Sequence, residues 1–195
     1  MSRAGQAIKR LFDVLMAGVA LVLLSPVFLV LAVLIRLGSP GPAIFRQERA
    51  GRDGRPFTMY KFRSMRSEAD AFGPSPSSAA DPRLTRLGRW LRETSLDELP
   101  QLWNILKGDM SLVGPRPLYM SQAEAFTPRQ RRRLEVRPGI FGLAQVQGRG
   151  ELPHEEKLEL DVQYVERMSL AQDLRILWCG LRMSVRRQKV YQKWK

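Results

Sequence analysis

The chain has 195 residues, of which 44% are hydrophobic, and it carries 32 lysines and arginines against 19 acidic residues, a formal net charge of +13. This composition suits one folded domain with an anchor and excludes global disorder, while the charge favours polyanionic partners such as nucleic acid, anionic lipid headgroups or phosphorylated substrates. One cysteine and one histidine exclude intramolecular disulfides and zinc sites built from several such ligands, so any chemistry must depend on carboxylates, lysines and arginines.

An uncharged apolar segment runs from Val14 to Ile35, long enough for a helix that crosses a bilayer. Ser25-Pro26 lies in its middle, and both flanks are basic. Because proline removes a backbone donor and basic flanks favour the cytoplasm, a helix–break–helix hairpin explains both features, with Ser25 bonding a carbonyl freed at the break. A straight or slightly kinked single-pass helix explains the segment equally well. A cleavable signal peptide does not, because no small-residue cleavage site follows.

The next part of the chain predicts a β-hairpin and then a helix. Residues 38–65 contain two short alternating apolar runs around the turn Asp53-Gly54, which indicates the hairpin. Residues 67–80 are small and polar and predict a surface loop. Asp81-Pro82 predicts the start of a helix that extends to Glu93. Along it, basic residues recur every third position and form either a solvated face or a phosphate contact: Arg83, Arg86, Arg89 and Arg92.

The remaining elements are mostly helical. We predict a helix from Ser95 to Lys107, a short exposed helix over 128–135, short strands within 136–152, and two helical pieces from Glu155 towards the end. The last piece has an apolar stripe that would pack against the core or lie on an anionic membrane surface: Leu170, Leu174, Leu177, Trp178, Leu181 and Val185. The predicted fold class is α+β, with helices around a small sheet.

Asp97 and Glu98 are adjacent acids at the start of the helix predicted from Ser95. Ser95 and Glu98 have the spacing of a capping box, and acids in a first turn complement the helix dipole, so a structural role alone explains them. The arginines before them and Gly114–Pro117 (GPRP) after them favour a functional role, because they gather anion-binding groups around the two acids. Two carboxylates with Mg²⁺ and nearby arginines are what phosphoryl transfer requires, and an aspartate can also act as the nucleophile.

Five stretches together resemble the bacterial sugar transferase family, the monotopic polyprenyl-phosphate phosphoglycosyl transferases. They are KRLFDV with the following apolar segment, SPGPAIFRQERAGRDGRPFTMYKFRSM, LTRLGRWLRETSLDELPQLWNILKGDMSLVGPRP, VRPGIFGLAQVQGRG and EEKLELDVQYVERMSLAQDLRIL. The resemblance covers most of the chain and fails only at 67–80, at 119–134 and in the tail.

The resemblance implies transfer of a hexose 1-phosphate from a UDP-sugar to undecaprenyl phosphate, with release of UMP and with Mg²⁺ as cofactor. It implies a re-entrant membrane anchor over 1–37, broken at Ser25-Pro26, and a catalytic domain over 38–195 with interfacial amphipathic helices. The enzyme would face the cytoplasm at the bacterial inner membrane, in contact with anionic lipid and without nucleic acid. A homodimer is left open.

The resemblance also assigns site residues. Asp97 would be the nucleophile, and Glu98 would assist it by metal binding or proton handling. Residues at family positions that line the phosphate site are Lys61, Arg92, Arg116 and Arg149. Arg137 also matches a motif position and is expected to bind substrate phosphate, although a structural role explains it equally, as it does Asp173. His154 stands where many members carry an aromatic residue, so no stacking role is assigned to it.

Two other functions compete with this interpretation. A membrane-tethered nucleic-acid-binding protein would use the net charge of +13, but the chain has no motif for DNA or RNA binding. A non-catalytic scaffold would use Asp97 and Glu98 only as helix caps.

Overall fold

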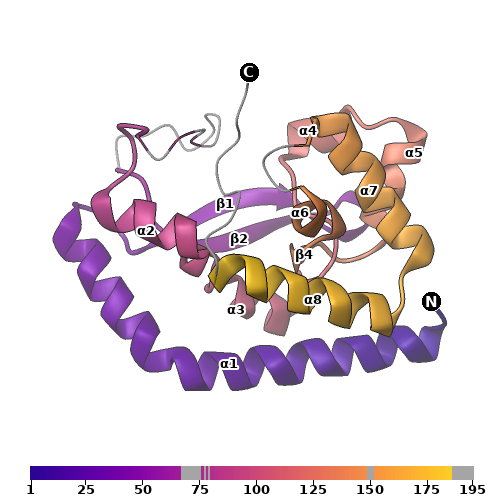
Figure 1. The fold of residues 1–195 in the computed structure, drawn as a ribbon, viewed down its shortest axis with the longest axis horizontal. Coiled ribbons are helices and arrows are strands. Elements are labelled where there is room, and N and C mark those ends of the chain that lie inside the picture. The colour runs from indigo at the N-terminus through magenta and orange to yellow at the C-terminus, as the bar shows by residue number, and fades with distance from the viewer. Residues whose placement is uncertain (67–75, 77, 79, 149–151, 186–195) are drawn as a thin grey trace.

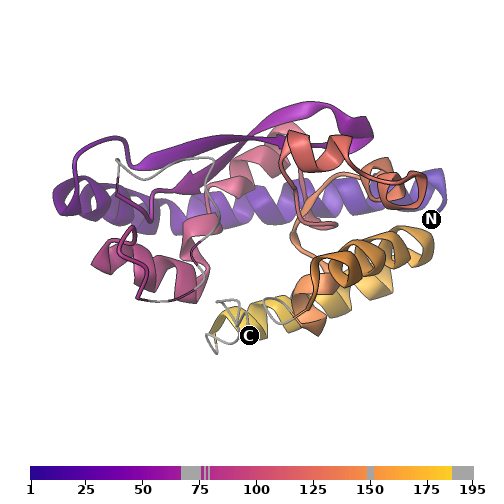
Figure 2. The same cartoon turned by 90° about the horizontal axis from the view of Figure 1, so that it is seen from above.

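The structure is a computed structural model that describes residues 1–66, 76, 78, 80–148 and 152–185. Within these residues, helices surround two small two-stranded sheets, which confirms the α+β class. Helix α1 (Arg3–Gly38) runs along the whole length of the molecule, and the strands and the other helices lie to one side of it (Figure 1). Seen from above, the β-hairpin and the C-terminal helices lie on opposite flanks (Figure 2).

Helix α1 is continuous, so the predicted separation into two helices at Ser25-Pro26 is absent. The helix bends part-way along its length, and Pro26 is the proline inside it (Figure 1). Because Pro26 has no N–H, the carbonyl of Val22 loses its usual donor one turn later. The Ser25 hydroxyl donates to that carbonyl at 2.8 Å, which confirms the partner predicted for Ser25. This hydrogen bond replaces the backbone donor that the proline removes.

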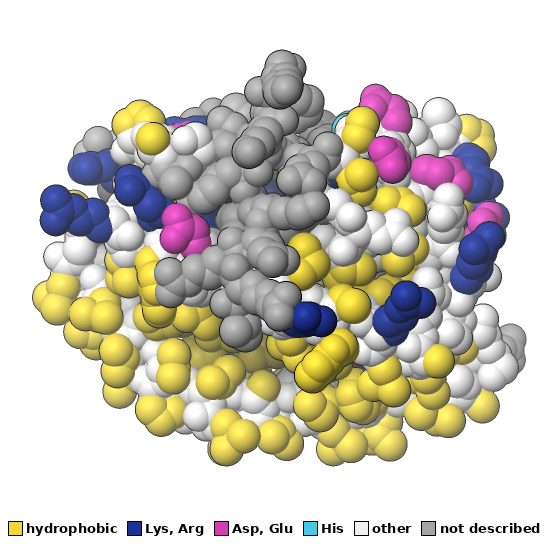
Figure 3. Space-filling model, viewed as in Figure 1, with side chains coloured by type: hydrophobic (Ala, Val, Ile, Leu, Met, Phe, Trp, Pro, Cys, Tyr) yellow, Lys and Arg dark blue, Asp and Glu magenta, His cyan; other side chains and the backbone are white. Residues whose placement is uncertain are grey.

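The surface of α1 is largely apolar and exposed. Among the described residues, α1 is the one helix long and apolar enough to cross a membrane, and only 11% of its most apolar stretch is buried. The core helix of a soluble protein would instead be mostly buried. A few small or branched side chains on the inner face, Ala17, Leu31 and Ile35, pack into the cores. Hydrophobic side chains cover the lower edge of the molecule, where α1 and α8 lie (Figure 3).

The predicted β-hairpin is confirmed. Strands β1 (Ile44–Ala50) and β2 (Pro56–Phe62) pair antiparallel, with Ile44 opposite Phe62. The short turn η1 (Arg52–Gly54) joins them, and Asp53 and Gly54 both have positive φ, 57° and 74°. Aspartate and glycine tolerate this left-handed conformation, which is why the pair predicts a hairpin turn.

Arg63, directly after β2, ties the hairpin to the end of α1. Its guanidinium donates to the carbonyl oxygens of Ser39 at 2.7 Å, Pro40 at 2.8 Å and Ile35 at 3.2 Å. The Ile35 carbonyl also accepts from the Ser39 amide at 3.3 Å, whereas the Ser39 and Pro40 carbonyls lie beyond the helix end, where a cation complements the negative end of the helix dipole. The strand that carries Lys61 is therefore fixed to the apolar helix.

Helix α2 (Arg86–Thr94) begins later than predicted. Asp81 does not cap it but accepts hydrogen bonds within a turn from Arg83, and Leu84 pairs with Met65 in an isolated bridge. Thr85 is the N-cap and accepts from the Gly88 amide at 2.8 Å. A Cβ at Gly88 would lie 1.8 Å from a backbone oxygen of residue 64, so only glycine allows α2 to pack this closely against the segment after β2.

The single helix predicted from Ser95 to Lys107 is also wrong. Ser95 adopts a left-handed conformation with φ 59° and ends α2. A short turn, η2 (Leu96–Glu98), follows, and α3 (Gln101–Lys107) begins after Pro100. The acids consequently lie in a tight corner between two helices rather than on a helix face.

The second sheet is parallel and is made of β3 (Ser111–Val113) and β4 (Gly139–Phe141). Its connection contains α4 (Met120–Glu124), α5 (Pro128–Arg131) and η3 (Arg132–Glu135), so the exposed helix predicted over 128–135 is present as two short pieces. A Cβ at Gly139 would lie 2.1 Å from the Gly114 nitrogen, so the two backbones meet directly at the start of the GPRP loop.

The C-terminal part contains α6 (Leu143–Gln147), α7 (His154–Arg167) and α8 (Leu170–Val185), so the two predicted helical pieces are present. Ile176 of α8 is buried in the core, whereas most of the predicted stripe faces outward. Leu174, Trp178 and Leu181 are 56%, 70% and 48% exposed. The stripe therefore does not serve mainly as core packing.

Candidate active site

The two adjacent acids of η2 have different surroundings. The side chain of Glu98 accepts hydrogen bonds from the Lys61 ammonium at 2.9 Å and from the Arg116 guanidinium at 2.8 Å, both at Oε1. Asp97 is buried, with 6% of its surface exposed, yet its carboxylate accepts no hydrogen bond from any residue that the structure describes. One acid is thus held by two cations, and the other keeps its oxygens available.

The capping-box explanation for these acids is wrong. Ser95 makes no side-chain cap to η2, and its left-handed backbone belongs to the end of α2. Glu98 turns away from Ser95 towards Lys61 on β2 and Arg116 in the loop after β3. These partners are distant in sequence, so the acids are positioned by the tertiary fold.

Arg92 completes the basic surroundings from the last turn of α2. One guanidinium nitrogen donates to the Ser64 hydroxyl at 3.4 Å, which orients the side chain. Its charge is among those that favour the ionised form of Asp97, together with those of Lys61 and Arg116. Three of the cations assigned to the phosphate site from the sequence therefore surround the acidic corner.

The electrostatics separate the two acids further. Burial raises the pKa of Asp97, and the neighbouring charge of Glu98 adds to this rise, although Lys61 opposes it. Burial also disfavours ionisation of Glu98, but the charges of Arg116 and Lys61 outweigh it and lower its pKa well below the ordinary range. The charge of Glu98 in turn raises the pKa of Arg116, whereas burial lowers that of Lys61.

Comparisons with known proteins identify the family of the chain. Residues 4–187 match the model of a family described as "Bacterial sugar transferase". The chain belongs to this family.

Several relatives are similar over most of this sugar transferase. It is 47% identical to an uncharacterized sugar transferase, EpsL, of Bacillus subtilis, over 90% of this chain and 86% of the relative. It is 42% identical to the UDP-glucose:undecaprenyl-phosphate glucose-1-phosphate transferase of Escherichia coli, over 91% of this chain and 40% of the relative. It is also 42% identical to a UDP-N-acetylgalactosamine-undecaprenyl-phosphate N-acetylgalactosaminephosphotransferase of Aeromonas hydrophila, over 90% and 43%. The chain thus spans less than half the length of the last two.

Not every residue predicted from the sequence joins the acidic corner of the sugar transferase. Arg137 donates from Nε to the Gly108 carbonyl at 2.8 Å, at the C-terminal end of α3, whereas Asp97 and Glu98 precede its N-terminal end. The structure therefore does not bring Arg137 to the carboxylates, because the end of α3 holds it elsewhere. Asp173 pairs with Lys9 at 2.8 Å in a separate network. Arg149 lies outside the described residues.

Sequence reasoning missed a group next to Arg116. The Arg49 guanidinium lies 3.6 Å from the centre of the Tyr119 ring, and its buried Nε has no hydrogen-bond partner among the described residues. Burial lowers the pKa of Arg49, and the nearby charge of Arg116 lowers it further; the same two causes lower the pKa of Lys157. The basic surface of the site therefore extends beyond Arg116. Position 49 gave no signal, because an arginine in a strand is ordinary.

The carboxylate oxygens of Asp97 and Glu98 fit a magnesium ion whose remaining ligands come from substrate phosphates. Within the described part of the chain, no group of three acidic, histidine or cysteine side chains could enclose a metal. Mg²⁺ is commonly bound by one or two carboxylates together with substrate phosphates, so a full protein cage is not required. The ion would be held by Asp97, whose oxygens accept no hydrogen bond from the described residues, and by Glu98 through the oxygen that faces neither cation.

Proposed function

We propose that this sugar transferase moves a sugar 1-phosphate from a UDP-sugar to undecaprenyl phosphate and releases UMP, at the cytoplasmic face of the bacterial inner membrane. The names of the Escherichia coli and Aeromonas hydrophila relatives support this donor and acceptor class. Those two names differ in the sugar, so the proposal is restricted to a UDP-linked hexose. The competing nucleic-acid and scaffold functions have no comparable support.

One observation carries the chemical proposal: Asp97 is a buried carboxylate without a hydrogen-bond donor among the described residues, beside an acid that two cations hold. A carboxylate that serves structure normally accepts hydrogen bonds, because a buried acceptor without a donor is destabilising. An oxygen without a donor in a cationic site is instead suited to attack an electrophilic phosphorus.

The reaction proceeds in two displacements. In the first, an Asp97 oxygen attacks the phosphorus that carries the sugar, the bond from this phosphorus to the bridging oxygen breaks, and UMP leaves with that oxygen. In the second, an oxygen of undecaprenyl phosphate attacks the same phosphorus, the acyl-phosphate bond breaks, and the Asp97 carboxylate is regenerated. The covalent intermediate allows the nucleotide to leave before the lipid phosphate reacts.

The surrounding cations have complementary roles in these steps. Lys61 and Arg116 keep Glu98 ionised and present positive charge where phosphate oxygens gain negative charge. Arg49 and Lys157 are close enough for the charge of Arg116 to lower their pKa values, and they extend the positive surface available to the diphosphate of the donor. A bound Mg²⁺ would supply further charge neutralisation on phosphate oxygens.

Exposed apolar surface supports a site at headgroup depth. Hydrophobic side chains gather over the lower part of the molecule, where α1 and α8 lie (Figures 1 and 3), and Trp178 and Trp103 are 70% and 54% exposed. Tryptophan is favoured at membrane–water interfaces. Because Arg63 ties the end of α1 to the strand of Lys61, insertion of α1 would hold the site close to lipid phosphates.

The decisive experiment is a UMP-release assay across UDP-hexoses, with undecaprenyl phosphate and Mg²⁺. We expect turnover with at least one donor and its loss when a chelator removes the metal. With a donor labelled in the sugar and no acceptor, label should remain on the protein in a hydroxylamine-sensitive form, as an acyl phosphate requires. Absence of UMP release with every UDP-hexose would refute the proposed activity.

A re-entrant anchor would now require the continuous, bent α1 to enter and leave the membrane on the same face, and this has its own test. In a Cys179→Ser background, Ala4→Cys and Arg46→Cys place one thiol before and one after the apolar stretch of α1. A hairpin predicts that an impermeant reagent added to one side of the membrane labels both thiols or neither. Labelling of the two from opposite sides would establish a spanning helix instead.

A further inference from the structure

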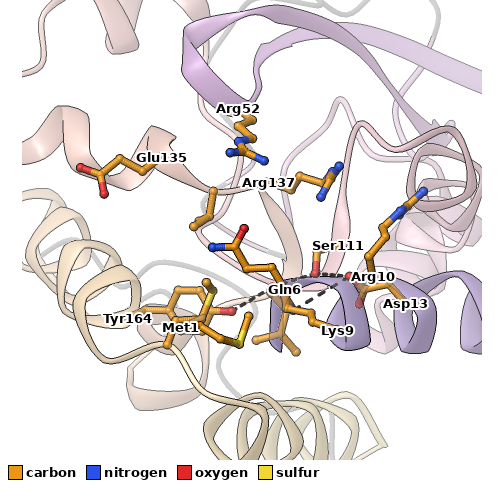
Figure 4. Close-up of a pocket in the computed structure, with 13 residues that line it drawn as sticks. Met1, Gln6, Lys9, Arg10, Asp13, Arg52, Ser111, Glu135, Arg137 and Tyr164 are labelled. Atoms are coloured by element: carbon orange, nitrogen blue, oxygen red, sulfur yellow. Dashed lines mark hydrogen bonds and ion pairs between the residues drawn. The ribbon is translucent and has the colours of Figure 1, made fainter. Parts of the chain in front are cut away.

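A basic cavity lies at the opposite end of α3 from Asp97 and Glu98 (Figure 4). Its walls come from the first turns of α1, the hairpin turn η1, the segment around residues 135–137 and the end of α7. Three arginines from distant parts of the chain line it: Arg10, Arg52 and Arg137. The proposed transfer reaction uses none of them.

Two of these arginines are oriented by the end of α3. Arg10 donates to the carbonyl oxygens of Ile105 at 2.7 Å and Leu106 at 3.1 Å, and Arg137 donates from Nε to Gly108 at 2.8 Å. Carbonyls at a helix C-terminus carry partial negative charge, which accounts for part of the attraction. They engage only Nε of Arg137, however, and they do not contact Arg52.

The other guanidinium nitrogens of Arg137 and those of Arg52 have few hydrogen-bond partners among the described residues. The Nη atoms of Arg137 have no hydrogen-bond partner among the residues that the structure describes, and Arg52 has only a 3.6 Å contact from Nε to Asp53. Figure 4 shows both guanidinium groups on the same side of the cavity, with the Gln6 amide extending towards them from α1. Two uncommitted guanidinium edges thus lie near each other.

The acids of the cavity do not neutralise this charge. Asp13 accepts from the Ser111 hydroxyl at 2.7 Å and from the Leu112 amide at 3.1 Å. Glu135 pairs with Arg132 at 3.2 Å. Burial lowers the pKa of Arg137, the positive charges of Arg10 and Arg52 lower it further, and the charge of Asp13 opposes this only in part.

We propose that this cavity binds a phosphate group, at a site separate from Asp97 and Glu98. Guanidinium edges match phosphate oxygens in a bidentate way, and an anion would relieve the repulsion among the arginines. The phosphate could come from a lipid headgroup, because the same turns of α1 expose Ile8 and Leu11 on their outer face, or from a soluble phosphorylated molecule. The recognition chemistry is the same for both sources.

The test compares Arg52→Ala with Arg55→Ala. Both remove one positive charge from an exposed position of the hairpin turn, but only Arg52 lines the cavity. All proteins also carry Arg116→Ala, which weakens phosphate binding at the acidic corner. The full chain is placed in phosphatidylcholine nanodiscs and titrated with inorganic pyrophosphate by calorimetry. In parallel, nanodiscs containing phosphatidic acid are examined by native mass spectrometry for retained lipid.

If the phosphate is soluble, Arg52→Ala raises the dissociation constant for pyrophosphate about tenfold or more, because a charge-assisted hydrogen bond is lost, and Arg55→Ala changes it little. If the phosphate belongs to a lipid, Arg52→Ala instead loses retained phosphatidic acid, and Arg55→Ala keeps it. Unfolding temperatures without ligand verify that both variants are folded. Equal behaviour of the two variants towards both probes, or no binding of either probe by the parent, overturns the proposal.

Discussion

The acidic corner differs from a second pair of carboxylates, Asp13 and Asp173, in how completely the protein satisfies it. Both pairs are largely buried and lie near a lysine. Asp13 and Asp173 are engaged by several donors and a cation: the Ser111 hydroxyl, the Leu112 amide, the Tyr164 hydroxyl at 2.7 Å and the Lys9 ammonium at 2.8 Å. Asp97 has no such donor among the described residues.

Asp13 and Asp173 hold together the elements that position the active-site residues. Lys9 also donates to the carbonyl of Val113 at 3.0 Å, and the Tyr164 hydroxyl oxygen lies 3.2 Å from the same carbonyl, so α1 and α7 both contact the end of β3. The loop after β3 carries Arg116 to Glu98. Asp13 and Asp173 thus stabilise the packing of these elements, and under the proposed function the less engaged carboxylate of Asp97 is the one that reacts.

The largest expected effect is the loss of activity on substitution of Asp97. Asp97→Asn keeps the shape but removes the nucleophilic charge, so we expect UMP release to fall at least about a thousandfold, the scale seen when a nucleophile is removed. Because the carboxylate accepts no hydrogen bond from the described residues, the unfolding temperature should be unchanged or slightly higher. Full activity of this variant would show that Asp97 is not the nucleophile.

The matched substitution in the satisfied pair is Asp13→Asn. An amide in place of the carboxylate turns one acceptor into a donor, so it cannot accept from both Ser111 and Leu112. We expect a loss of about 2–4 kcal/mol in the free energy of unfolding, because a buried charge-assisted network is broken. Denaturant unfolding measures this loss. A variant as stable as the parent would show that the hydrogen bonds of Asp13 do not stabilise the fold.

A smaller effect concerns the pH dependence of the transfer. Attack requires ionised Asp97, and burial raises its pKa, so activity should fall as the pH drops through this raised value, at higher pH than for an ordinary aspartate. Arg116 is one of the cations that lower the pKa of Asp97. Arg116→Ala should therefore move the acid limb of the rate profile to still higher pH.

The profile of kcat/KM for UMP release tests this shift. The control is Arg129→Ala, which removes a surface arginine paired with Glu159 and Glu166 rather than with the acids of η2 and should leave the acid limb in place. An unchanged limb in the Arg116 variant would mean that ionisation of Asp97 does not control the reaction.

Local sequence signals predicted those parts of the fold that depend on local geometry. Asp53-Gly54 marked the hairpin because both residues tolerate positive φ. Asp81-Pro82 misled for the same kind of reason. Its capping signal is local, but the pairing of Leu84 with Met65 holds this segment outside the helix, and that contact has no local signature.

The candidate site shows the same division. The motif identified Asp97 and Glu98, and the family resemblance added Lys61 and Arg116, but the spacing of Ser95 and Glu98 suggested a cap that does not form. The partners of Glu98 lie 37 and 18 residues away, so only the tertiary fold reveals them. Arg137 was grouped with the phosphate site by its motif, and its contact with the end of α3 could not be read from spacing.

The smallest expected effect concerns a single backbone carbonyl in α1, that of Val22. The Ser25 hydroxyl donates to the Val22 carbonyl, whose helical donor is missing because residue 26 is proline. Ser25→Ala leaves this acceptor without a partner, and we expect a local loss of about 1 kcal/mol, seen as faster hydrogen exchange in the turns after Pro26. Ser184 makes a similar bond to the Gly180 carbonyl within an uninterrupted part of α8, so that carbonyl retains its backbone donor in Ser184→Ala. We expect faster exchange around residue 25 in Ser25→Ala and unchanged exchange around residue 184 in Ser184→Ala, because only the Val22 carbonyl depends on a serine as its donor. An equal change in both variants would contradict this explanation.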